Sequence, residues 1–140
     1  MNDPMLSEMH FNDGTLTNYD IKNLDVRPEL VVLSACNTGQ GEIEEGIIGL
    51  SRGFLEAGVK SVQSSLWSID DYASSEIIKE MYMNLKKGQK KSEALRNSKL
   101  DYLSKADKLR KHPYYWAGMV HIGDDSPFFP RSTIVICYYS

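Results

Sequence analysis

The sequence predicts an α/β fold in which helices pack against a largely parallel sheet. A continuous apolar run, Leu30 to Ala35, lies between Pro28 and a polar loop, which is typical of a strand buried on both faces. A second β-prone segment, Val59 to Trp67, follows a stretch whose apolar residues recur at helical spacing. Strand, helix and strand in this order predict a right-handed parallel crossover.

The residues before this unit predict a hairpin and a short helix. Asn12-Asp13-Gly14 separates Met9–Phe11 from Thr15–Thr17, and Asp-Gly suits a tight turn because it tolerates positive φ. Residues 17–24 predict one or two helical turns, which Pro28 does not allow to continue.

Three helices are predicted after the first buried strand. The first covers residues 47–58 and ends at a glycine, which suits a helix C-terminus. The second is capped by Asp70 or Asp71 and ends at Gly88, and the third begins at Ser92. The basic runs 86–87 and 90–91 favour a solvated helix end.

The C-terminal region predicts one more principal strand, from Tyr115 to Ile122, with a turn at residues 123–125. The β-prone run Ile134 to Tyr139 has no role that the sequence defines. We place one domain at residues 1–124 and a tail at residues 125–140. Three principal strands are fewer than the roughly five or six of a doubly wound sheet, so we expect a truncated domain.

Composition excludes several classes of function. The chain has 140 residues, of which 41% are hydrophobic and 25% are charged, as in a globular domain. A net charge of −3 gives no basic footprint for nucleic acid, and no apolar stretch is long enough to span a bilayer. The start of the chain does not have the pattern of a signal peptide, so we expect a cytoplasmic protein.

The two cysteines, Cys36 and Cys137, lie far apart, and neither has a histidine close by in the sequence. A structural disulfide and a zinc site are therefore not expected, and we predict no metal and no cofactor. Cys36 follows the central strand, at the end where open α/β sheets place their ligands. The small residues after it could direct backbone N–H groups at an oxyanion. A buried, inert cysteine is the alternative, and spacing leaves both open.

Four segments in order add a family resemblance. They are Leu33 to Gly39 (LSACNTG), the glycine-bearing helix of residues 46–58, Ser65 to Asp71 (SLWSIDD), and Pro113 to Gly118 (PYYWAG). Together they resemble CHAT domains, which are caspase-like cysteine peptidases of clan CD, over about residues 7–124. The resemblance implies a three-layer αβα sandwich and a cysteine endopeptidase. We expect a bacterial protein.

The resemblance also implies roles for individual residues. Cys36 is the implied nucleophile, and Asn37, Thr38 and Gly39 form the implied oxyanion loop. The implied base is a histidine of a His-Gly pair, at the end of the strand before the cysteine strand. None of the three histidines, His10, His112 and His121, is followed by glycine. We therefore expect that the N-terminal strands, with the histidine strand, are missing and that the chain alone is inactive.

A peptide or protein substrate is implied to lie extended beside residues 64–68, as an added β-strand. The implied substrate contacts are Ser65, Trp67, Ser68, Asp70 and Asp71. The two aspartates could select a basic side chain, whereas helix capping is the simpler role for one of them. An upstream segment or a helical-repeat protein is the expected source of the histidine.

Two other interpretations stay open. The first is a non-enzymatic protein-interaction module derived from a CHAT domain. The second uses Ser51, because residues 49–53 match G-x-S-x-G, but that motif requires a strand-to-helix turn and here lies within a predicted helix. The missing histidine strand also predicts an unpaired edge along Leu30 to Ala35, which would promote self-association.

Overall fold

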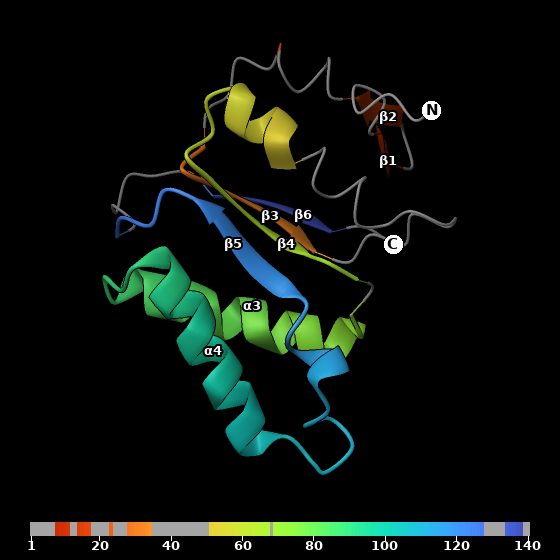
Figure 1. Cartoon of the computed structure of the whole chain (residues 1–140), viewed down its shortest axis with the longest axis vertical. Helices are drawn as coiled ribbons and strands as arrows, with labels where there is room; N and C mark the ends of the chain where they lie inside the picture. Colours follow the sequence, from red (N-terminus) through yellow and green to blue (C-terminus); the bar gives the residue numbers. More distant parts are fainter. Residues whose placement is uncertain are drawn as a thin grey trace.

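The structure, a computed structural model, describes residues 8–11, 14–17, 23, 28–34, 51–67, 69–127 and 134–138. Figure 1 shows a sheet between helices and a separate small hairpin. In the hairpin, β1 (Glu8–Phe11) pairs antiparallel with β2 (Gly14–Thr17), and Phe11 lies opposite Gly14. The predicted hairpin is therefore confirmed, while most of the short helix predicted over residues 17–24 falls outside the described residues.

Within the described residues, the main sheet has four strands in the order β5-β4-β3-β6. Their bounds are Leu30–Ser34 for β3, Ser61–Ser65 for β4, Met119–Gly123 for β5 and Ile134–Tyr138 for β6. β3 and β4 are parallel neighbours, with Leu30 opposite Ser61, as the crossover pattern predicts. β5 is antiparallel to β4 and forms one edge of the sheet.

The start of the third predicted strand is wrong by four residues. Pro113–Tyr115 form a short 3-10 helix, η2, and β5 begins only at Met119. Proline suits the first turn of a helix because its fixed φ and missing N–H cost nothing there. The turn after β5 is also specific: Gly123 has φ of 107°, and a Cβ at this position would lie 2.5 Å from the Lys60 carbonyl oxygen.

The expected open edge of β3 is also wrong, because β6 covers it. The two strands are parallel and in register from Leu30 opposite Ile134 to Ser34 opposite Tyr138. β6 lies on the side of β3 away from β4, so the chain crosses the width of the sheet after β5 (Figure 1). This pairing joins segments that are far apart in the sequence. Local patterns therefore predicted a β-prone run at residues 134–139 but not its pairing with β3.

Helices cover both faces of the sheet, which makes three layers (Figure 1). Leu30 and Val32 of β3 belong to a core with α3 (Asp71–Lys86) and α4 (Lys91–Lys105). Val31 and Leu33 belong to a second core with Phe54, which lies in the helical residues 51–56. The alternation of side chains along a strand produces these two cores. The predicted caspase-like αβα architecture is confirmed.

Candidate functional site

The position of Cys36 follows from β3. This strand is central, has a parallel neighbour on each side and ends at Ser34, two residues before Cys36. The residues Cys36, Asn37, Thr38, Gly39 and Ser68 lie outside the described part of the chain, so the roles predicted for them stay predictions. The described surroundings are the carboxyl ends of β3 and β4 and the segments that follow β4.

The segment after β4 is fixed by the loop that precedes β5. The Leu66 N–H donates to the Gly118 carbonyl at 2.7 Å, and Trp67 Nε1 donates to the Tyr114 carbonyl at 2.8 Å. The indole also covers Gly118 closely, because a Cβ on Gly118 would lie 2.8 Å from the ring. Two of the four segments that carry the family resemblance therefore meet at this end of the sheet. Trp67 positions this junction, and its N–H is already used within the chain.

The end of β4 is buried, and Ser64 there is paired on both sides. Ser64 lies opposite Leu33 of β3 and Val120 of β5, and Ser65 lies opposite Met119. The hydroxyls of Ser64 and Ser65 are buried and have no hydrogen-bond partner among the described residues. The Leu66 N–H is also bonded, and the Ser65 side chain lies inside the protein.

The two aspartates after β4 have different roles. Asp70 caps α3, because its Oδ2 accepts the Ala73 N–H at 3.1 Å. Asp71 is the first residue of α3 and is exposed, and its carboxylate has no hydrogen-bond or ion-pair partner among the described residues. The predicted cap is confirmed for Asp70, and the substrate contact predicted for Asp71 stays a prediction.

The histidines with described side chains both use the ring lone pair that a base would need. His112 Nδ1 accepts the Tyr114 N–H at 3.2 Å. His121 Nδ1 lies 3.3 Å from Gln63 Nε2, and its Nε2 lies 3.0 Å from the Asp124 carbonyl, so the neutral ring carries its proton on Nε2. Burial lowers the pKa of His121, although the bond to the Asp124 carbonyl opposes this effect. The side chain of His10 lies outside the described part of the chain, so the predicted lack of a suitable histidine stays a prediction.

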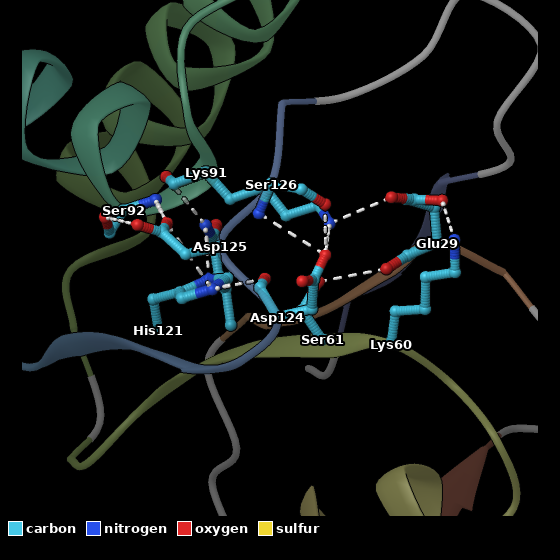
Figure 2. Close-up of polar contacts among 10 residues, drawn as sticks. Glu29, Lys60, Ser61, Lys91, Ser92, His121, Asp124, Asp125 and Ser126 are labelled. Atoms are coloured by element: carbon cyan, nitrogen blue, oxygen red, sulfur yellow. Dashed lines mark hydrogen bonds and ion pairs between the residues drawn. The ribbon is translucent and has the colours of Figure 1, made fainter.

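A buried charge cluster lies at the opposite, amino end of β3 and β4 (Figure 2). Lys91 is completely buried, and its Nζ lies 3.0 Å from Glu29 Oε1 and 3.2 Å from Asp124 Oδ2. Lys60 reaches Glu29 Oε2 at 3.3 Å from the surface. The solvated position predicted for Lys91 is therefore wrong, because its two acidic partners come from distant parts of the sequence.

The carboxylates of this cluster are held in the charged form. Burial alone would raise the pKa of Glu29, but the hydrogen bonds and charges of Lys91 and Lys60 lower it below the usual value. Hydrogen bonds from Ser126 and Lys91 lower the pKa of Asp124. Within the described residues, no three histidine, cysteine or acidic side chains are grouped as metal ligands. The cluster is therefore an ion-pair network that joins β3, β5 and α4.

The three-layer αβα sandwich is the architecture expected of a caspase-like α/β protein. The model of the CHAT domain family matches residues 2–124, and the chain belongs to this family. No solved structure matches the chain. In the described part of the chain, no helix is both long and apolar enough to cross a bilayer.

The curated relatives that match are much longer than this chain. Tetratricopeptide repeat protein 28 of Homo sapiens is 33% identical over 121 residues, which are 86% of this chain and 5% of that protein. The Mus musculus protein of the same name is 31% identical over the same shares. The chain thus spans about 5% of the length of these curated relatives. Both are mammalian, so they give no support to the bacterial origin that we expected.

Proposed function

We propose that this chain carries the nucleophile half of a caspase-like cysteine endopeptidase site, with Cys36 as the nucleophile. The observation that supports this most is the place of Cys36, two residues beyond the central strand β3. In the proposed reaction the Cys36 thiolate attacks the scissile carbonyl of a peptide. Backbone N–H groups of Asn37, Thr38 and Gly39 then stabilise the oxyanion.

The proposed site needs a histidine from a partner or from another segment. A free cysteine with a pKa of about 8.5 is mostly protonated at neutral pH, and a reduced thiol suits the cytoplasm. General-base assistance contributes about 10²–10⁴-fold, so the chain alone should turn over slowly. A protein with helical repeats is a reasonable source, since the relatives are named tetratricopeptide repeat proteins.

The proposed substrate is an extended peptide that pairs with the backbone from Trp67 onward, through Ser68. Asp71 would select a basic side chain there, because Asp70 already caps α3 and Asp71 has no described partner. Trp67 would hold the backbone of this segment through its contact with Gly118. The side chain of Ser65 is buried, so Ser65 would support the site as part of β4 and would not contact the substrate through its side chain.

The test uses an electrophilic peptide probe with lysine or arginine next to its warhead. The probe should label Cys36, and Cys36→Ala should abolish labelling while the matched variant Cys137→Ala retains it. Asp71→Asn should weaken labelling by the basic probe more than labelling by a neutral one. Labelling that persists in Cys36→Ala would refute the nucleophile assignment. Fast, Cys36-dependent peptide hydrolysis by the isolated chain would refute the need for an external histidine.

A non-enzymatic interaction module is the second candidate, and the position of β6 favours it. This strand fills the place beside β3 and has the sequence Ile-Val-Ile-Cys-Tyr, which contains no histidine. If the domain is such a module, iodoacetamide should alkylate Cys36 no faster than an ordinary exposed thiol, even when the partner or segment proposed to supply the histidine is added. A rate well above that of a model thiol at pH 7 in the presence of that partner would favour the peptidase.

A further inference from the structure

The edge of β3 opposite β4 has properties that the proposed chemistry does not explain. β6 is the outermost strand on this side, and β3 is the one described element against which it packs extensively. β6 is reached through the C-terminal region, after the chain has crossed from the far edge of the sheet. Among the described strands, it is therefore an edge strand that pairs with β3 alone.

β3 itself is held independently of β6. Its other edge pairs with β4, and its side chains pack on both faces of the sheet. Leu30, Val31 and Val32 are completely buried, and Leu33 is 2% exposed. A strand fixed by one neighbour and two helical layers keeps its place when its other neighbour leaves. The free edge would then present unpaired N–H and C=O groups to any suitable strand.

We propose that the β3 edge is a strand-binding slot, that β6 is its exchangeable occupant, and that a partner's β-strand enters parallel to β3 in its place. The slot fits an apolar segment of about five residues without proline or charge, as β6 itself shows. Parallel entry puts the carboxyl end of the new strand beside Ser34, where Tyr138 lies now.

This direction of entry matters for the site. Cys36 follows Ser34 by two residues, so a residue just beyond an incoming parallel strand arrives at the same end of the sheet. A histidine at that point of the partner would lie at the end of the sheet at which β3 finishes, two residues before Cys36 in the sequence. This part of the inference rests on the proposed function, whereas the exchange of strands does not.

Contacts of Asp124 and Asp125 with α4 keep the C-terminal tail attached to the domain while β6 exchanges. Lys91 binds Asp124, and the Asp125 carboxylate accepts the Ser92 N–H at 2.7 Å and the Ser92 hydroxyl at 2.8 Å. The tether that begins there is short, so β6 competes at an effective concentration on the order of millimolar. A free strand should therefore bind weakly to the intact chain and much better once the tether is cut.

The experiment inserts a protease site between residues 129 and 132 of the full chain. After cleavage, a fluorescent peptide of residues 132–140 is added, and its anisotropy is followed for one day. We expect saturable binding to the cleaved chain and binding at least about tenfold weaker to the uncleaved chain, because of the tether. The matched control peptide carries Ile136→Pro, which disturbs strand pairing and should not bind.

Three results would overturn the proposal. They are no uptake of peptide by a cleaved chain that stays folded, equal binding to cleaved and uncleaved chains, and unfolding when the tail is released. Hydrogen exchange on the intact Ile136→Pro chain is the second measurement: β3 should lose protection while α3 keeps it. If α3 loses protection equally, β6 is part of the core and not an exchangeable strand. None of these readouts involves Cys36, so failure here is distinct from failure of the peptidase proposal.

Discussion

Replacing Lys91 by methionine should destabilise the domain strongly. The ammonium is completely buried between Glu29 and Asp124, and Glu29 has only 7% of its side chain exposed. Removal of one partner of a buried ion pair costs about 3–5 kcal/mol, because the other charge is left without compensation. Lys60 still reaches Glu29 from the surface, so we expect about 3 kcal/mol.

Urea unfolding followed by circular dichroism measures this loss. With a slope of about 2 kcal/mol per molar urea, the midpoint should fall by roughly 1.5 M. Lys105→Met is the matched control, since it removes a lysine of the same helix whose pair with Asp101 is exposed, and it should change little. The double variant Glu29→Gln with Lys91→Met should be more stable than Lys91→Met alone, because no carboxylate stays buried beside an apolar side chain.

Acid should remove the same interaction. The pKa of Glu29 is lowered in the folded chain, so its contribution is full above the usual value of 4.5 and is lost as pH falls through the folded value. The coupling between Glu29 and Lys91 in the double-mutant cycle should therefore vanish in acid. A loss below about 1 kcal/mol in Lys91→Met, or a coupling that does not change with pH, would refute this account of the cluster.

Three further predictions concern the rest of the structure. Burial lowers the pKa of His121 in the folded chain, so as pH falls the imidazole is protonated more readily in the unfolded chain. The free energy of unfolding should therefore decrease as pH drops through 6.5, and His121→Gln should remove this pH dependence in urea titrations. Gly118→Ala should cost about 1–3 kcal/mol and change tryptophan fluorescence, because the new methyl group clashes with Trp67. Asp70→Ala should cost about 1 kcal/mol in thermal unfolding through the lost cap, and an equal loss in Asp71→Ala would contradict the assignment of the cap to Asp70.

Local patterns predicted the parts of the fold that depend on local physics. The run from Leu30 is apolar without interruption because β3 is covered on both faces, and the Asp-Gly turn and the Asp70 cap act within a few residues of themselves. The strand after Pro113 was predicted to start too early, because the apolar run begins at Tyr115, still within the 3-10 turn, whereas β5 begins at Met119.

Non-local pairings account for what the sequence did not reveal. The run of residues 134–138 shows β propensity, but its place beside β3 depends on a strand about a hundred residues earlier in the chain. Lys91 stands in a basic run typical of a solvated helix end, and only the fold brings Glu29 and Asp124 to it. The same holds for Trp67 and Gly118, whose contact joins two segments that were recognised separately.

The two ends of β3 have separate physical roles, and the tail connects them. At the amino end, the ion pairs of Lys91 fix the residues that leave β5, so the chain starts its crossing from a rigid point. At the carboxyl end, β6 finishes beside Ser34, next to the point where Cys36 follows. A change at the amino end should therefore alter the hold of β6 on β3 before it alters the core under α3. Weaker protection of β3 amides in Lys91→Met, at urea concentrations where α3 remains protected, would be the signature of this order. Simultaneous loss in both elements would mean that the cluster stabilises the domain as a whole and does not control the β3 edge.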